Sequence, residues 1–214
     1  MKYRFFLALF IPFIFSCNQS DNQPVKYSQK QIDSLKAVFN AYLKERNRTF
    51  LEEAWSPLPD KDKQNFSGLN YYPYDINWRF EGALELLSDP DTVIILGSKG
   101  EERKCFNFAY FHFNKNGNKF KLLILKFPAH KAGNKPYLFL GFWDKTSGRE
   151  TYAGGRYIDI EENSENHYVI DFNYSYNPYC AYNHRYSCAV PPLENRLPIE
   201  IKAGEKIFKK TLTR

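Results

Sequence analysis

Hydrophobic residues near the start of the sequence recur at the spacing of an amphipathic helix. Beyond residue 28, apolar side chains return every three or four positions, which is the period of one helix face. Ser28 and Gln31 have the spacing of a capping box, in which each side chain satisfies a free backbone N–H at a helix start. The pattern predicts a helix from residue 28 to about Asn47 that packs on a sheet, since a single apolar stripe more often faces a core than a partner. The stripe consists of Ile32, Leu35, Phe39, Tyr42 and Leu43.

Beyond Gly68 the pattern changes to short runs of branched and aromatic residues separated by turn-forming residues. Two of these runs flank Asn114-Lys-Asn-Gly-Asn118, which favours a β-hairpin with a five-residue turn. Closely spaced strands after one helix predict a mainly β, α+β domain: a curled antiparallel sheet, barrel- or sandwich-like, with an N-terminal amphipathic helix. The predicted strands cover residues 92–96, 105–113, 119–127, 137–143, 156–160 and 168–172.

The first 26 residues differ from the rest. A basic start precedes an apolar run over residues 5–15, which is too short to span a bilayer as a helix and is typical of a signal peptide. The run ends in Ile14-Phe15-Ser16-Cys17, which resembles a bacterial lipobox, where the cysteine is lipidated and becomes the first mature residue. We expect a signal peptide over residues 1–16, a lipidated Cys17 with a tether over 17–26, and one globular domain over 27–214. Lipid would hold this domain at a membrane of the cell envelope; plain secretion is the alternative.

Composition narrows the function classes. Aromatic residues make up 18% of the chain, with 16 Tyr and 19 Phe, which favours β structure and permits a binding face built from rings. The formal charge is +6, but no run of four Lys or Arg and no nucleic-acid motif occurs. We therefore expect no nucleic-acid partner.

Polar residues gather in the last third of the chain. Residues 146–156 read Thr-Ser-Gly-Arg-Glu-Thr-Tyr-Ala-Gly-Gly-Arg, residues 171–178 read Asp-Phe-Asn-Tyr-Ser-Tyr-Asn-Pro, and residues 191–198 read Pro-Pro-Leu-Glu-Asn-Arg-Leu-Pro. With two cysteines that have seven residues between them and the upstream segment Tyr72-Pro73-Tyr74-Asp75, these segments resemble the signature of a bacterial and archaeal family, domain-of-unknown-function family 1684. The resemblance covers about residues 30–208 and implies no activity. The chain departs from the family at Tyr179, where proline is usual, and at His184, for which the family implies no role.

Phosphate loops, zinc helices and nucleophile elbows are absent from the sequence, and its four histidines lack metal-ligand spacing. Candidate binding or catalytic residues must therefore be chosen by the chemistry of their side chains. We expect no metal and no cofactor. Arginine beside carboxylates suits either the binding of an anionic group or buried ion pairs that hold loops. Tyrosine beside asparagine suits a small envelope ligand or a glycan, or else a loop packed on its own rings. The candidate ligand-binding residues are Arg156, Asp171, Asn173, Tyr176, Asn177, Glu194, Asn195 and Arg196.

Two function classes remain open. The first is a lipid-anchored envelope protein with a non-catalytic binding or accessory role. The alternative is an envelope hydrolase or transferase, with Asp171 or Glu194 as general acid or base and Arg156 or Arg196 holding substrate charge.

The two cysteines of this region, Cys180 and Cys188, are candidates for a disulfide, which is the usual state of a cysteine pair in an oxidising envelope. Unpaired thiols and a metal or redox role are the alternatives. Redox work is the weakest of these on sequence grounds, because the pair lacks the Cys-x-x-Cys arrangement.

Overall fold

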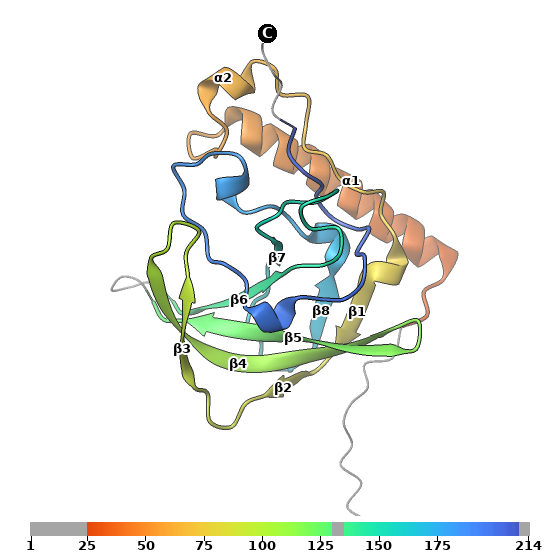
Figure 1. Ribbon diagram of the computed structural model, residues 1–214. Coiled ribbons are helices and arrows are strands. Elements are labelled where there is room, and N and C mark those ends of the chain that lie inside the picture. The colour runs from red at the N-terminus through yellow and green to blue at the C-terminus, as the bar shows by residue number, and fades with distance from the viewer. Residues whose placement is uncertain (1–24, 130–134, 210–214) are drawn as a thin grey trace, which may run out of the picture.

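A computed structural model describes residues 25–129 and 135–209, so the expected leader, Cys17 and most of the tether lie outside the described residues. Within them, one long helix lies beside two antiparallel sheets (Figure 1). The helices are α1 (Gln29–Glu52), α2 (Asp60–Lys63), and the 3-10 turns η1 (Ile76–Trp78), η2 (Phe172–Tyr174), η3 (Tyr179–Ala181) and η4 (Leu193–Asn195). The strands are β1 (Arg79–Gly82), β2 (Leu84–Leu86), β3 (Thr92–Leu96), β4 (Glu102–Lys115), β5 (Asn118–Phe127), β6 (Tyr137–Phe142), β7 (Arg156–Ile158) and β8 (Tyr168–Asp171).

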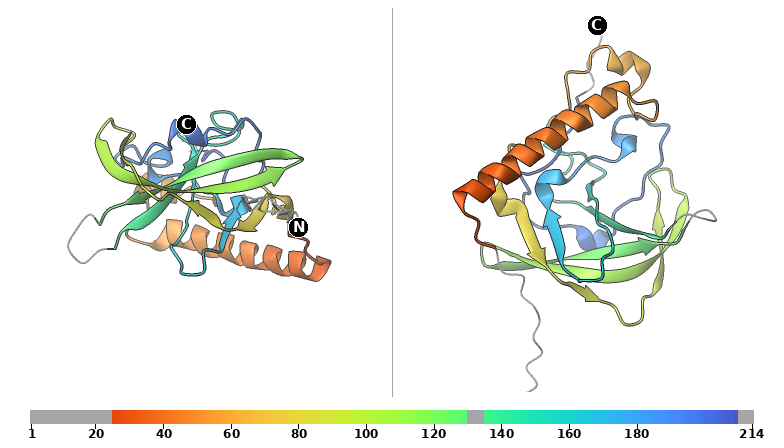
Figure 2. Two further views of the ribbon diagram at one scale, coloured as in Figure 1. Left: turned by 90° about the horizontal axis from the view of Figure 1, so that it is seen from below. Right: turned by 180° about the vertical axis from the view of Figure 1, so that it is seen from behind.

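The larger sheet has the order β2-β4-β5-β6-β7, and β3 pairs with the part of β4 that β2 leaves uncovered. Strands β1 and β8 form a second, two-stranded sheet. The predicted mainly β, antiparallel fold with an N-terminal helix is confirmed. The barrel alternative is wrong, because the larger sheet runs from β2 and β3 to β7 without closing on itself in the described residues (Figure 2).

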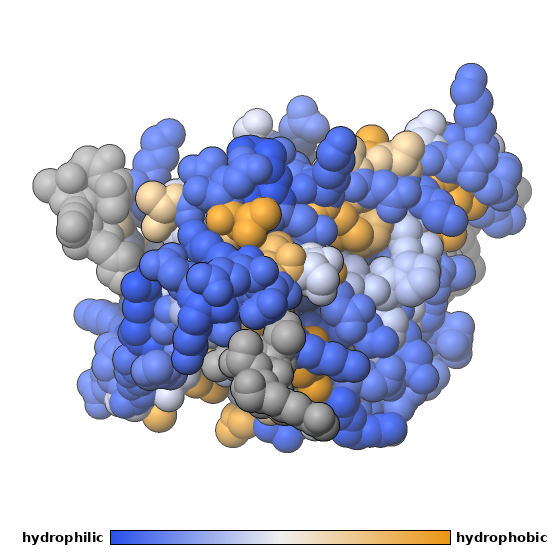
Figure 3. Space-filling model, turned by 90° about the horizontal axis from the view of Figure 1, so that it is seen from above, coloured by the Kyte–Doolittle hydropathy of each residue, from blue (hydrophilic) through white to orange (hydrophobic). Residues whose placement is uncertain are grey.

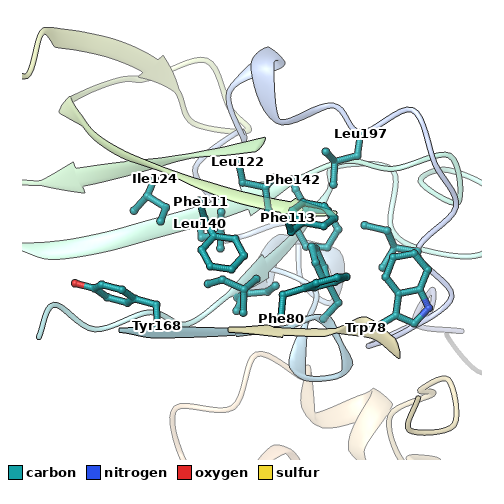
Figure 4. Packing of buried hydrophobic residues seen from close by; sticks show 14 of the residues in the cluster. Trp78, Phe80, Phe111, Phe113, Leu122, Ile124, Leu140, Phe142, Tyr168 and Leu197 are labelled. Atoms are coloured by element: carbon teal, nitrogen blue, oxygen red, sulfur yellow. The ribbon is translucent and has the colours of Figure 1, made fainter. Parts of the chain in front are cut away.

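The core lies between the two sheets. Phe80 from the small sheet faces Phe111 and Leu140 from the large one (Figure 4). Ile170 of β8 belongs to the same buried cluster. Phe172, directly after β8, is fully buried and its ring contacts four other aromatic rings, those of Trp78, Phe80, Phe113 and Phe142. This ring cluster joins the small sheet to the large one.

The hairpin between β4 and β5 is tighter than its sequence predicts. Asn116 and Gly117 form a two-residue loop with φ values of 52° and 78°. Both residues are in the left-handed region, as a type I′ turn requires, and this turn matches the twist of its two strands. The predicted five-residue turn is wrong because its outer residues continue the ladder, with Lys115 opposite Asn118.

Helix α1 begins with the predicted capping box: the N–H of Gln31 donates to Ser28 Oγ and the N–H of Ser28 to Gln31 Oε1. The helix continues past Asn47 to Glu52 and buries Phe39 and Phe50. Figure 3, which views this end of the molecule from above, shows mainly hydrophilic residues with smaller apolar patches.

The buried stripe of α1 packs on tyrosine-rich loops. Phe39 contacts the rings of Tyr71, Tyr74 and Tyr174, with centroids 6.1, 5.4 and 5.3 Å away. These residues come from the segment before β1 and from η2 after β8, so the helix covers loops at the end of the small sheet. The predicted helix therefore forms, with a layer of aromatic loops between it and the sheets.

We expect Phe172→Ala to lower the free energy of unfolding by roughly 3–5 kcal/mol, because it opens a cavity where both sheets meet. Urea denaturation followed by circular dichroism measures the change. Leu193→Ala is the control, since Leu193 is 77% exposed and its truncation should change stability by less than about 0.5 kcal/mol. Equal losses in both variants would contradict the assignment of Phe172 to the centre of the core.

Candidate functional site

Four tyrosines line one groove between the β6–β7 edge and the loop over residues 176–189. The groove has a volume of about 320 Å³, and its rings are Tyr137 on β6, Tyr157 on β7, and Tyr176 and Tyr179 on the loop. Backbone pairing brings these four rings together. Strands β6 and β7 are antiparallel neighbours, and an isolated bridge places Tyr157 beside Tyr176 of the loop. Aromatic walls of this kind provide flat, largely apolar contact area with hydroxyl groups at its edge.

Hydrogen bonds fix these rings in place. The hydroxyl of Tyr176 donates to Asp159 Oδ1 at 2.6 Å, and that of Tyr157 donates to the carbonyl of Ala189. Burial raises the pKa of Tyr157 and of Tyr176 above the ordinary value of 10.0. Both phenols are therefore neutral at physiological pH and act as hydrogen-bonding groups.

One cation and one anion line the same groove. Arg103 on β4 donates from Nη2 to the carbonyl of Ser187 at 2.9 Å and forms an ion pair with Glu101 at 2.6 Å. Asp159 lines the groove from the end of β7. The groove thus combines ring faces, hydroxyl groups and both signs of charge, which is the composition of a polar ligand site.

Two thiols lie at the loop end of the groove. Cys188 lines the groove, and the backbone N–H of Cys180 points at Cys188 Sγ with an N–S distance of 3.2 Å. Both are free thiols in the structure, and the disulfide predicted from sequence stays a prediction.

Arg156 lies in the interior, away from the groove. Its side chain is 0% exposed, and Nη2 donates to Asp144 Oδ1 at 3.3 Å and to the carbonyl of Ile201 at 3.0 Å. Nη1 donates to the carbonyl of Ala203. Burial lowers the pKa of the guanidinium, and the Asp144 carboxylate opposes that shift. Arg156 therefore fastens the C-terminal segment to the β6–β7 connection.

A second charge pair, between a buried carboxylate and a partly buried arginine, fastens the same segment to α1. Glu205 is fully buried and accepts hydrogen bonds from the hydroxyls of Tyr182 and Tyr71 and from the backbone N–H of Asn177. Arg46 on α1 lies 3.6 Å away. Burial raises the pKa of Glu205 above the ordinary value of 4.5, although Arg46 and these hydrogen bonds oppose the rise.

Three predicted asparagines bind backbone groups of distant segments. Asn195 accepts from the N–H of Leu123 and donates to the carbonyls of Leu123 and Gly141, which holds η4 on β5 and β6. Asn173 bonds both backbone groups of Asp75. Asn177 donates to the carbonyl of Lys206. All three side chains are buried, and each joins two chain segments.

The predicted carboxylates are also occupied. Asp171 accepts from Arg79 at 3.4 Å and from Asn173, and burial raises its pKa against these contacts. Glu194 is exposed and pairs with Lys121 at 3.0 Å. Arg196 is exposed and lies over the ring of Trp143. Of the eight predicted ligand-binding residues, the structure places Tyr176 in the groove lining and the other seven outside it, and among those seven it brings Asp171 and Asn173 into hydrogen-bond contact.

Sequence reasoning did not identify Arg46 and Glu205 as a pair. Arg46 follows Phe39 and Tyr42 and precedes Phe50 at helical spacing, so a charged residue interrupts an otherwise aromatic stripe. A charged side chain on an apolar helix face indicates a buried partner of opposite charge, and this was the signal that could have identified the pair. Arg103 and Asp159, which line the groove, carry no comparable signal, because they stand in ordinary alternating strand sequence.

In residues 25–129 and 135–209, His, Cys, Asp and Glu do not gather in groups of three that could hold a metal ion. Within the same ranges, no helix is long and apolar enough to cross a membrane.

Comparison with known proteins identifies a family without a known activity. The sequence model of a family described as "Protein of unknown function (DUF1684)" matches residues 64–206, which confirms the resemblance predicted from the motifs. No curated protein matches the chain.

One solved structure similar to this chain is the solution NMR structure of an uncharacterized protein from Haloarcula marismortui. It is 28% identical in sequence with a TM-score of 0.62, and the match covers 84% of this chain and 97% of the archaeal one. The similarity therefore extends over nearly the whole archaeal protein.

The buried carboxyl of Glu205 predicts a pH dependence of stability. Its pKa is higher in the folded protein than in the unfolded chain, so its contribution is fully present below about pH 4.5 and is lost as the pH rises through the folded value. The loss is about 1.4 kcal/mol for each pH unit between the two pKa values. We expect Glu205→Gln to make the free energy of unfolding, measured in urea between pH 4.5 and 8, fall less steeply than in the parent.

Glu200→Gln is the matched control. Glu200 is partly exposed to solvent, and a hydrogen bond from Lys202 lowers its pKa, so it titrates below this window. Its variant should keep the parental slope. If Glu205→Gln also kept that slope, the carboxyl of Glu205 would not be destabilised by burial.

Proposed function

The chain belongs to the DUF1684 family, and we propose that it is a lipid-anchored cell-envelope protein that binds a small glycan-type ligand in the tyrosine-lined groove. The observation that carries the proposal is the convergence of Tyr137, Tyr157, Tyr176 and Tyr179 on one groove that also contains Arg103 and Asp159. Sugar rings bind through stacking on aromatic faces together with hydrogen bonds to hydroxyl and charged groups, and this groove offers both.

The size and rigidity of the groove fit such a ligand. A volume of about 320 Å³ is at the lower end of the usual range for small-molecule sites. Tyr157 and Tyr176 are already held by hydrogen bonds to Ala189 and Asp159, so little conformational freedom is lost on binding. Tyr137 is 43% exposed and supplies ring area at the rim.

A binding role accounts for the carboxylates better than hydrolysis does. A general acid or base needs a carboxyl group within reach of the substrate. Asp171 is paired with Arg79 and hydrogen-bonded to Asn173, and Glu194 is paired with Lys121. Neither lines the groove, so we do not propose the hydrolase or transferase alternative.

Membrane attachment is the second part of the proposal, and it is supported by the sequence of the leader. Two or more acyl chains at Cys17 would keep the protein on the bilayer, because each buried methylene adds about 0.8 kcal/mol of membrane affinity. The polar tether after Cys17 would leave the domain in the aqueous phase beside that membrane.

We expect soluble oligosaccharides, such as peptidoglycan fragments and N-acetylglucosamine oligomers, to raise the melting temperature of the purified protein. Tyr137→Ala should weaken binding roughly threefold to tenfold, since one aromatic contact contributes roughly 0.5–1.5 kcal/mol. Isothermal titration calorimetry measures the change. Tyr110→Ala, on β4 and outside the groove lining, is the matched control and should bind as the parent does. No response to any oligosaccharide, or equal weakening by both variants, contradicts the proposal.

We expect Cys17→Ser to move the protein from the membrane fraction to the soluble fraction and to abolish incorporation of labelled fatty acid. The reason is that serine lacks the thiol that carries the acyl chain. Ser20→Ala, three residues along the tether, is the control and should stay with the membranes. Unchanged membrane fractionation of Cys17→Ser would show that attachment does not depend on lipid at this residue.

A further inference from the structure

Two thiols that the binding proposal does not use lie in contact beside the groove. Cys180 belongs to η3 and Cys188 follows it eight residues later, yet the N–H of Cys180 reaches Cys188 Sγ at 3.2 Å. The hydroxyl of Tyr152 lies 3.7 Å from Cys180 Sγ, within hydrogen-bond range for sulfur. Both cysteines are partly exposed, whereas Cys105, in the middle of β4, is 0% exposed.

The two thiols are chemically different. A hydrogen bond from Cys188 lowers the pKa of Cys180 to about 6, against the effect of burial and with help from Tyr152 and Ser98. The same hydrogen bond, together with burial, raises the pKa of Cys188. Cys180 is therefore the thiolate of the pair at neutral pH, and Cys188 is the thiol that donates to it.

The chain that carries Cys188 is held independently of any bond between the sulfurs. The carbonyl of Cys188 accepts a hydrogen bond from the N–H of Ser98 at 2.8 Å, and the N–H of Cys188 donates to Ser98 Oγ at 3.1 Å. The next residues are fixed as well, because Val190 donates to the carbonyl of Leu96 at 2.8 Å and Ala189 accepts from Tyr157.

The other end of the nine-residue loop is equally secured. Tyr182 is fully buried against Phe50 and Phe208, and Asn183 donates to the carbonyl of Tyr179. The loop is folded with free thiols. Because these bonds do not depend on a link between the two sulfurs, we expect the domain to stay folded whether that disulfide is formed or broken.

We propose that Cys180 and Cys188 form a thiol–disulfide exchange site whose substrate is a small or peptide-borne disulfide that enters through the tyrosine-lined groove. The thiolate of Cys180 attacks one sulfur of the incoming disulfide, which breaks its S–S bond, releases one thiolate and leaves a mixed disulfide on Cys180. The sulfur of Cys188 then attacks Cys180 Sγ and gives its proton to the departing second thiolate. The two cysteines lose two electrons in total, and the incoming disulfide gains them to become one thiolate and one thiol.

The roles of the two residues follow from their surroundings. The attacking group must be ionised near neutral pH, as Cys180 is, and the resolving group must lie beside it, as Cys188 does. Cys188 lines the groove, and Cys180, which does not line it, is partly exposed and lies beside Cys188. A disulfide that occupies the groove therefore reaches Cys188 directly and Cys180 at the adjoining surface. The site does not depend on the glycan-binding proposal, because it rests on the two thiols and the bonds that hold their loop.

The test uses the full chain carrying Cys17→Ser, so that Cys17 does not contribute a thiol, after reduction with dithiothreitol and removal of the reductant. Oxidised glutathione is the probe, and mass spectrometry assigns the products. We expect the parent to form the Cys180–Cys188 disulfide, Cys188→Ser to accumulate a glutathione adduct on Cys180, and Cys180→Ser to react at least tenfold more slowly. Cys105→Ser is the matched control and should behave as the parent does.

The pH profile gives a second readout. The rate of alkylation of Cys180 by iodoacetamide should rise with a midpoint near pH 6 in the parent, because the thiolate is the reactive form. In Cys188→Ser the midpoint should move upward, because the lost hydrogen bond is the main cause of the low pKa. Equal reactivity of the two cysteines, reaction only after unfolding as judged by circular dichroism, or unfolding of the parent on reduction would each overturn the proposal.

Discussion

Arg156 carries a positive charge in the interior of the domain, and backbone carbonyls of the C-terminal segment supply most of its hydrogen-bond acceptors. An unpaired guanidinium at this depth would cost several kcal/mol, so the segment over residues 201–205 cannot leave without exposing the domain to that penalty. Asp144 reinforces the arrangement, because its Oδ2 accepts from the N–H of Ile201 at 2.7 Å. The position of the C-terminal segment is thus set by one buried cation.

Much of the remaining structure depends on that segment. Gly204 has a φ of +79°, and a Cβ built there would lie 2.0 Å from Ser175 Oγ, so only glycine lets the segment pass against η2. The next residue, Glu205, then meets Tyr182 from the groove loop and Arg46 from α1. Through these contacts one strip of chain joins the sheets, the helix and the loop that forms one wall of the groove.

The sequence predicted the elements whose signal is local. The capping box at Ser28 and all six predicted strands are such cases, because helix capping and the alternation of apolar residues depend only on residues that are close together in the sequence. Strands β1 and β2 were missed, since they are separated by Ala83 alone and do not stand out as two runs. The equally short β7 and β8 were found because turn-forming residues separate them from their neighbours. The polar motifs were harder to interpret. Asn173, Asn195 and Arg156 have side chains that suit a ligand, but a protein backbone offers the same donors and acceptors. Which of the two each side chain meets depends on contacts with segments 47 or more positions away. That information exists only in the folded chain.

The longest strand, β4, runs from the groove to the end of the domain where the described chain begins. Arg103 of the groove stands near the first residue of β4, and the hairpin tip at its last residues lines a pocket with Val25 and Tyr27, where the described chain begins. At about 3.3 Å per residue, the twelve steps from Arg103 to Lys115 correspond to roughly 40 Å. If lipid at Cys17 attaches the chain to a bilayer, as proposed, the length of β4 would separate the end of the domain nearest the described N-terminus from the aromatic rings, and the groove would open at the far end of this strand.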